Sequence, residues 1–175
     1  MNECHRIIET ARLTLRPMES ADIEPIHRIS NEPGVRKYLF DDKAVASELI
    51  RETHQQSVTN FESRGFGIWM IREKERDEVI GFCGLRVIED LDQVEILYAL
   101  SESKWNFGYA LEAARIVERY AFDRAGLGSL IGVTDRANLA SWRVLEKLKM
   151  REYRPAGARE HLRYAVITRH EFQVR

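Results

Sequence analysis

The sequence lacks several features that would place it in a specialised class of protein. It has only two cysteines, Cys4 and Cys83, among 175 residues, and they fit neither a disulfide framework nor a Cys-x-x-Cys metal site. Its five histidines are scattered, so a zinc mechanism has little support and we expect no metal. No apolar run approaches the roughly 18 residues of a membrane span. The start of the chain has no apolar stretch behind a basic head. We therefore expect a cytoplasmic protein that does not act on membranes.

An excess of charge of one sign is also missing. Lys and Arg number 27 against 28 Asp and Glu, so no overall basic field exists to attract nucleic acid or anionic lipid. The chain has four prolines and no repeat, low-complexity tract or flexible linker that would divide it. With 44% hydrophobic and 31% charged residues, it has the composition of a globular protein with a sizeable core. We expect one domain over residues 1–175.

Hydrophobic periodicity predicts alternating strands and helices. The expected strands show short β-rich or alternating runs, and lie at residues 10–17, 67–72, 79–87, 94–100, 129–134 and 165–168. The expected helices show a helical period, and lie at residues 20–30, 44–60, 110–121 and 140–148. Three consecutive strands separated by charged turns read as antiparallel neighbours. This order predicts an α/β fold with a mixed, mostly antiparallel central sheet flanked by helices.

The most informative segment runs from the strand at residues 94–100 through a loop into the start of a helix. Gly108 and Ala110 lie where the backbone turns into that helix. A helix start has about four unsatisfied N–H groups and a positive dipole end, and small residues let an anion approach them. A pyrophosphate would suit this position. Gly108 taken alone is better explained by a tight turn.

This segment resembles the acetyl-CoA-binding segment of the GNAT superfamily. The resemblance is strongest to the branch of ribosomal-protein alanine N-acetyltransferases, in which Tyr-x-Leu is followed by Trp-Gly-x-Gly-Tyr-Ala. Asn106 replaces the first glycine of that pattern, which we expect to weaken one phosphate contact without removing the site. The resemblance implies that coenzyme A is bound by Tyr98, Leu100, Trp105, Asn106, Phe107, Gly108, Tyr109 and Ala110.

A second block, residues 138–150, resembles the family's Asn-x-x-Ser-x-x-x-Leu-Glu-Lys-x-Gly-Met/Phe pattern. The resemblance implies that Asn138 lies beside the pantetheine arm and that Ser141 lies near the thioester sulfur. Lys149 stands where the family has glycine, so we expect the turn after this helix to differ. An asparagine and a serine three residues apart are also the ordinary signature of a helix cap, and this alternative stays open.

The resemblance implies transfer of an acetyl group from acetyl-CoA to a primary amine by direct attack. An alkyl amine is mostly protonated at pH 7, so a general base is useful, and Glu95 is the candidate. The alternative is that Glu95 points to solvent from an alternating strand. A backbone N–H near Leu100 would hold the thioester oxygen. The family often donates a proton from a tyrosine, but Leu145 stands there, which leaves Ser141 as the candidate, either as proton donor or as a hydrogen bond to the sulfur.

The sequence does not identify the acceptor. A protein N-terminal α-amine is one possibility, and a polyamine, amino acid or antibiotic is another. Acidic residues at 41–42 and 89–92 would help to recruit a cationic acceptor, although both groups are also explained as solvated turns. From a different class, a catalytically weak acyl-CoA-binding sensor would use the same pocket. Similar proteins are commonly dimers, so a homodimer is one expectation.

Overall fold

The structure is a computed structural model that describes residues 6–76 and 78–175. Cys4 lies outside these residues. In the described part of the chain, the strands form one sheet in the order β1-β2-β3-β4-β5-β6-β8-β7. The strands are β1 Ile8–Glu9, β2 Leu13–Pro17, β3 Ile68–Glu73, β4 Glu78–Ile88, β5 Gln93–Leu100, β6 Ser129–Asp135, β7 Arg151–Tyr153 and β8 Leu162–Thr168. The helices are α1 Ile23–Ser30, α2 Pro33–Leu39, α3 Ser47–Ser63, α4 Tyr109–Asp123, α5 Leu139–Lys147 and α6 Arg169–Gln173.

The sheet confirms the expected mixed, mostly antiparallel architecture flanked by helices. β5 and β6 pair in parallel, whereas the other described neighbours are antiparallel. The three consecutive strands β3, β4 and β5 are adjacent, as the charged turns between them predict. Among the described helices, none is long and apolar enough to cross a lipid bilayer.

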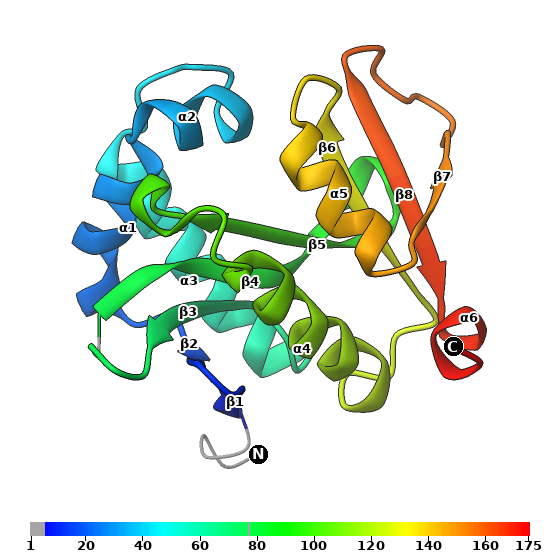
Figure 1. Cartoon of the computed structure of the whole chain (residues 1–175), viewed down its shortest axis with the longest axis horizontal. Coiled ribbons are helices and arrows are strands. Elements are labelled where there is room, and N and C mark those ends of the chain that lie inside the picture. The colour runs from blue at the N-terminus through cyan, green and yellow to red at the C-terminus, as the bar shows by residue number, and fades with distance from the viewer. Residues whose placement is uncertain (1–5, 77) are drawn as a thin grey trace.

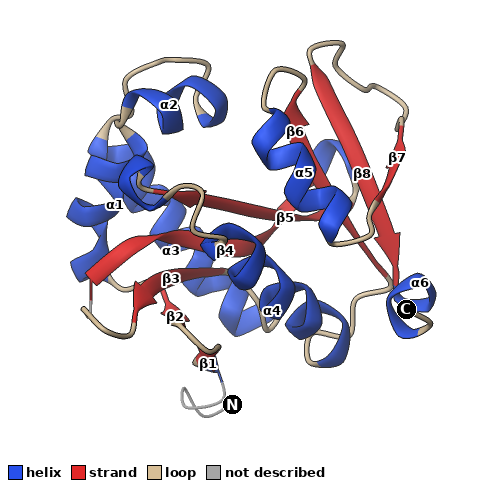
Figure 2. Ribbon diagram, in the orientation of Figure 1, coloured by secondary structure: helices blue, strands red, loops and turns tan. Residues whose placement is uncertain are grey.

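Helices cover both faces of the sheet, and each face has its own apolar cluster (Figure 2). One cluster joins the sheet to α4 and α5 and includes Trp69, Val117 and Leu145. The other joins the opposite face to α1 and includes Ile26 and Phe82. Fully burying one such side chain contributes about 1.5–3 kcal/mol, so these clusters fix the helices on the sheet.

The sheet opens between β5 and β6. Glu95 and Ile131 are the partners recorded between these two strands, whereas β4 and β5 pair continuously from Gly81–Ile88 to Gln93–Leu100. Figure 1 shows β6 and β8 running steeply across the direction of β5. Beyond Glu95, therefore, the carboxyl-terminal halves of β5 and β6 diverge. In open α/β sheets, ligands bind outside the carboxyl ends of parallel strands.

Two helices, α2 and α6, were not predicted from the sequence. α2 begins with Pro33, which is favoured at the first position of a helix because its missing N–H would have no partner there. α6 begins with a capping box, in which Thr168 accepts from the Glu171 backbone and the Glu171 carboxylate accepts from the Thr168 backbone. Both helices are short, and such helices depend on capping and tertiary contacts for stability.

Candidate functional site

The opening between β5 and β6 exposes peptide groups of β5. Ser101 donates its backbone N–H to the Ile80 carbonyl, which fixes the alternation of antiparallel bonding along β4 and β5. By that alternation, the peptide groups of Tyr98 and Leu100 point away from β4 and toward the opening. The Leu100 carbonyl accepts the Trp105 indole N–H at 2.8 Å. The Leu100 N–H is left facing the opening, as an oxyanion donor would be.

Glu95 lies at the closed end of the opening and is buried, with 3% of its surface exposed. The alternative that it points to solvent is therefore wrong. Its carboxylate accepts a hydrogen bond from the Arg86 guanidinium at 2.6 Å. Val133 lies two residues beyond Ile131 on β6, and its backbone helps to lower the pKa of this carboxylate. Burial raises the pKa of Glu95, and the nearby Arg86 opposes that shift.

Tyr98 and Ser141 bring the two sequence motifs together. The Tyr98 hydroxyl lies 3.0 Å from the Ser141 hydroxyl and 3.1 Å from the Ser141 carbonyl oxygen. Burial raises the pKa of Tyr98, so its hydroxyl keeps its proton. Asn138 caps α5 by accepting the Ser141 backbone N–H at 3.0 Å. The helix-cap interpretation of Asn138 is therefore correct, and its side-chain amide N–H₂ group remains available as a donor.

The loop before α4 presents a row of backbone donors. In the described residues, the N–H groups of residues 106–111 donate no hydrogen bond, and the first helical bond runs from Glu112 to the Gly108 carbonyl. Asn106 and Gly108 have φ values of 66° and 83°. Asparagine tolerates this left-handed conformation better than most residues, so Asn106 keeps the backbone that a glycine would adopt. Lys149, the other glycine replacement, has φ 63°, so its turn also keeps a glycine-like backbone.

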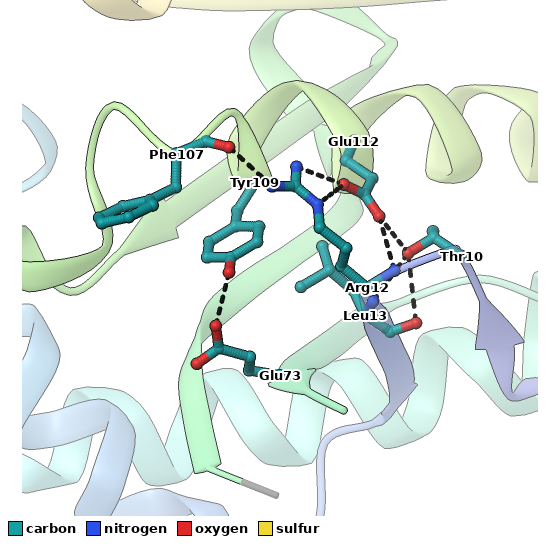
Figure 3. A network of polar contacts seen from close by, with 7 residues as sticks. All are labelled: Thr10, Arg12, Leu13, Glu73, Phe107, Tyr109 and Glu112. Carbon is teal, nitrogen blue, oxygen red and sulfur yellow. Dashed lines mark hydrogen bonds and ion pairs between the residues drawn. The ribbon is translucent and has the colours of Figure 1, made fainter. Parts of the chain in front are cut away.

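An ion-pair network fixes this loop to the first strands (Figure 3). The Arg12 guanidinium contacts the Glu112 carboxylate at 2.6 Å, and donates to the Phe107 carbonyl at 3.0 Å. Thr10 donates its hydroxyl to the same carboxylate at 2.6 Å. Arg12 also lies over the Tyr109 ring, with its guanidinium carbon 4.4 Å from the ring centre. Glu112 compensates the charge of Arg12, so the network holds the loop and its row of backbone donors in place.

Tyr109 and Lys104 anchor the same loop to the end of β3. The Tyr109 hydroxyl donates to the Glu73 carboxylate at 2.5 Å, and Lys104 donates to its other oxygen at 2.5 Å. Both hydrogen bonds lower the pKa of Glu73, and the bond from Lys104 has the larger effect. The side chains predicted to bind coenzyme A therefore have different tasks. Tyr109 holds the loop through its hydroxyl, whereas Phe107 is 59% exposed.

Two carboxylates tie α2 to the loop that follows β5. Glu32 accepts from the Ser101 hydroxyl at 2.8 Å and from the Glu102 backbone at 2.6 Å. In return, the Glu102 carboxylate accepts from the Gly34 backbone near the start of α2, at 2.5 Å. The Trp105 ring packs on Gly34 so closely that a Cβ there would lie 2.5 Å from it. Trp105 therefore holds α2 and the end of β5 together.

The acidic residues predicted to recruit a cationic acceptor lie apart from one another. Asp42 pairs with Arg36 at 3.1 Å, and Asp41 lies 4.0 Å from Lys43. β5 and β6 diverge toward Leu100, at the carboxyl end of β5. Residues 89–92 precede β5 and therefore lie at its other end. Within residues 6–76 and 78–175, no three His, Cys, Asp or Glu side chains gather closely enough to hold a metal ion.

Comparison with known proteins identifies the family. The model of the acetyltransferase (GNAT) domain matches residues 12–151, which include both motifs and the whole opening between β5 and β6. The chain belongs to the GNAT acetyltransferase family. As a member, it is an acetyl-CoA-dependent N-acetyltransferase. The unpaired amides of residues 106–111, at the start of α4, fit the pyrophosphate of that cosubstrate.

Relatives agree with this assignment. An N-acetyltransferase from Bacillus licheniformis, p20, is 31% identical over 161 residues, covering 86% of this chain and 88% of that protein. The structure of an acetyltransferase from Agrobacterium tumefaciens has a TM-score of 0.82 at 23% identity, covering 92% of this chain and 93% of that one. RimL, a ribosomal α-N-protein acetyltransferase solved with coenzyme A, has a TM-score of 0.73 at 18% identity, covering 93% and 97%. The latter two likenesses show the GNAT fold.

Reasoning from the sequence missed three contributors to the site. Arg86 pairs with Glu95 because their strands are antiparallel neighbours, and that register depends on the length of the turn between them. The contact between Tyr98 and Ser141 joins elements 43 residues apart. Arg12 and Glu112 lie 100 residues apart, so the sequence carries no local signal of their contact.

Proposed function

We propose that this GNAT enzyme acetylates the α-amino group of a peptide or protein, with Glu95 as the general base. The observation that carries the proposal is the placement of Glu95 and the Tyr98–Ser141 hydroxyl pair on opposite faces of β5, at the opening beside β6. Side chains on a strand alternate between faces, so residues 95 and 98 project to opposite sides. An amine approaching from one face and a thiolate leaving toward the other would suit a thioester held in the opening.

The base chemistry follows from the burial of Glu95. A carboxylate with a raised pKa is a better proton acceptor than an exposed one. The α-ammonium group has a pKa of about 8, against about 10.4 for a lysine-like amine. Removing a proton from the α-amine is therefore easier by about 3 kcal/mol, at 1.36 kcal/mol per pKa unit. This difference favours an N-terminal acceptor over an alkyl amine.

The proton for the leaving thiolate comes from the hydroxyl pair in this proposal. Tyr98 keeps its proton and shares a hydrogen bond with Ser141, so the pair supplies a donor although Leu145 stands where many relatives have a tyrosine. The Leu100 N–H faces the thioester oxygen and stabilises the charge that develops on it. Burial raises the pKa of the Cys83 thiol, which makes a thiolate intermediate unfavourable.

Coenzyme A would be held by the loop before α4 and by α5. The N–H groups of residues 106–111 would bind the pyrophosphate, with Trp105 and Tyr109 fixing the loop. Asn138 donates its side-chain amide to the pantetheine arm, while its oxygen caps α5. The side chains of Tyr98 and Ser141 lie at the reactive end.

An acetyl-transfer screen tests the proposal. The wild-type enzyme is given acetyl-CoA with peptides that have free N-termini, the same peptides acetylated at the N-terminus but carrying a lysine, spermidine, free amino acids and aminoglycosides. Release of coenzyme A thiol and the mass of the acceptor are measured. We expect acetylation of free peptide N-termini. Preferred turnover of spermidine or an aminoglycoside would assign the small-amine alternative, and tight coenzyme A binding without turnover of any acceptor would assign the sensor alternative.

A further inference from the structure

A pocket rich in arginine lies at the end of the β7–β8 hairpin, outside the residues assigned to catalysis or coenzyme A. Its volume is about 350 Å³. It is lined by Arg136, Glu152, Tyr153, Arg154, Ala158, Leu162, Arg163 and Tyr164. The lining therefore contains three arginines and one carboxylate, a net charge of +2. Arginine clusters of this kind suit carboxylate or phosphate ligands.

The three arginines are not equally engaged. Arg163 stacks on Trp142 and pairs with both oxygens of Glu152, so its charge is largely compensated. Arg136 uses its Nε to donate to the Glu160 carbonyl at 2.6 Å, which fixes the guanidinium and leaves its terminal nitrogens as donors. In the described part of the chain, Arg154 has no recorded hydrogen bond or ion pair. Two guanidinium groups are thus available to one anion.

A buried hydroxyl adds a second donor type to the pocket. The Tyr153 hydroxyl oxygen is buried and has no hydrogen-bond partner among the described residues. Burial raises the pKa of Tyr153, so the group is a protonated donor. Leaving such a group unsatisfied costs about 1–3 kcal/mol. A ligand oxygen bound in the pocket would remove that cost, whereas the neighbouring Tyr164 hydroxyl already accepts the Arg159 backbone N–H.

Two residues of the pocket lining, Tyr153 and Tyr164, share a face of the sheet with Glu95. Directly paired residues project to the same face, and Glu95 pairs with Ile131 on β6. Two residues further along β6, Val133 pairs with Tyr164, which pairs with Tyr153. Three strand spacings of about 4.8 Å and a step of two residues along β6, about 6.6 Å, separate Glu95 from Tyr153, or about 16 Å in all. An extended peptide advances about 3.3 Å per residue, so an N-terminal amine at Glu95 brings the third to fifth side chain to the pocket.

We propose that this pocket binds a carboxylate of the acceptor, so that the preferred acceptors are peptides with an acidic side chain three to five residues into the chain. The link between the pocket and the acceptor rests on the proposed N-terminal acetylation. The net positive charge also disfavours polyamines, which would place like charges beside Arg154.

Matched peptides test the proposal at fixed ionic strength. Acceptor peptides carrying glutamate at the third, fourth or fifth position are compared with otherwise identical glutamine peptides. At the best position we expect KM at least about tenfold lower for glutamate, with kcat little changed, because a hydrogen bond to a charged group contributes this much binding. Arg154→Gln and Arg136→Gln should each remove most of that preference. Arg159→Gln, which alters an exposed arginine of the same loop outside the lining, should keep it.

Tyr153→Phe separates a binding role from a structural one. Removing an unpartnered buried hydroxyl should leave the protein at least as stable to urea, while it weakens the preference for glutamate. Equal KM values for glutamate and glutamine peptides at every position, or a preference that survives Arg154→Gln and Arg136→Gln together, would overturn the proposal.

Product binding distinguishes this proposal from the proposed function. N-terminally acetylated glutamate and glutamine peptides are titrated by calorimetry into the protein with coenzyme A, so that no turnover is required. Tighter binding of the glutamate product with no acetylation of any peptide would refute the N-terminal acetylation and support the carboxylate pocket. If glutarate alone binds and neither peptide pair is discriminated, the pocket is not an acceptor subsite and the proposal fails.

Discussion

The sheet has two arms that differ in how completely their strands pair. In the arm from β1 to β5, β4 and β5 pair along Gly81–Ile88 and Gln93–Leu100, and apolar clusters cover both faces. The arm of β6, β8 and β7 joins the first through the partners Glu95 and Ile131. Backbone groups that complete the ladder in one arm are thus left free at the junction. The fully paired strands contribute most of the stability, whereas the backbone groups left unpaired at the junction are the ones available to bind substrates.

The largest effect should come from placing a negative charge in the loop before α4. Gly108→Asp combines a left-handed backbone with a carboxylate beside the amides proposed to bind pyrophosphate. Two like charges about 4 Å apart repel by about 4 kcal/mol at an effective dielectric constant of 20, so coenzyme A affinity should fall about a thousandfold. Calorimetric titration measures the affinity. Gly65→Asp is the matched control, because Gly65 has φ 77° and open space around it in the paired arm. Similar affinity losses in both variants would mean that backbone strain, not charge, is responsible.

Glu95→Gln should lower kcat by at least about a hundredfold, since a general base contributes about 10²–10⁴. Coenzyme A affinity should stay the same. The control is Glu118→Gln. Glu118 lies on α4, is fully buried and pairs with Arg175, so this variant should be less stable but should keep its kcat. A near-normal rate for Glu95→Gln with an unchanged pH profile would falsify the assignment of the base.

The pH dependence of kcat should also differ between the wild type and Glu95→Gln. Burial raises the pKa of Glu95, and the base must be ionised, so the wild-type rate should fall as pH drops through that raised value. Glu95→Gln should lack this limb and recover partly as pH approaches the pKa of the amine. Because the pKa of Glu95 is higher in the folded than in the unfolded protein, its protonated form stabilises the fold. This contribution to the free energy of unfolding is complete below the ordinary glutamate pKa, and it is lost as pH rises through the pKa of Glu95 in the folded protein. Thermal unfolding at several pH values measures the second effect.

A smaller change is expected at the hydroxyl pair. Tyr98→Phe and Ser141→Ala should each reduce kcat about tenfold, and the double variant should lose little more, because both remove the same hydrogen-bonded unit. Tyr120→Phe removes a hydroxyl that donates to the Gly65 carbonyl in the paired arm, and it should leave kcat unchanged. Additive losses in the double variant would show that the two hydroxyls act separately.

The smallest effect is expected at a strained turn outside the junction. Lys149 has φ 63°, which costs a side-chain-bearing residue about 1–2 kcal/mol. Lys149→Gly removes that cost but adds flexibility to the unfolded chain, so a net gain of about 0.5–1 kcal/mol is expected in urea unfolding. Coenzyme A affinity should not change. Destabilisation of this variant would indicate that the lysine side chain makes a contribution larger than the strain.

The sequence predicted the elements whose signals are local. β3, β4, β5 and α4 have strong periodicity, and each begins within about two residues of its expected position. α2 was missed because Pro33 and Gly34 indicate a turn, while the group that satisfies its start, Glu102, lies 68 residues away. The capping box of α6 was visible in the sequence at Thr168 and Glu171 and could have been found.

The candidate site divides in the same way. The loop from Trp105 to Ala110 was predicted from its motif, because its function depends on consecutive residues. The environment of Glu95 was not, since its burial depends on the pairing of β5 with both neighbours. The arginine pocket was also missed because its members come from separate segments on either side of α5, and they meet only when β6 and β8 pair.

The reciprocal hydrogen bonds of Glu32 and Glu102 couple the order of α2 to the order of the loop after β5. Each carboxylate caps the segment that carries the other, so releasing α2 leaves donors unsatisfied in the loop after β5, and the reverse also holds. The two segments therefore loosen as one cooperative unit. Trp105 packs on Gly34 of α2, so a cosubstrate that rigidifies Trp105 also helps to order α2. A second ligand that binds to α2 then has a smaller entropic cost of binding. By reciprocity, any ligand that held α2 in place would strengthen the binding of coenzyme A by the same factor.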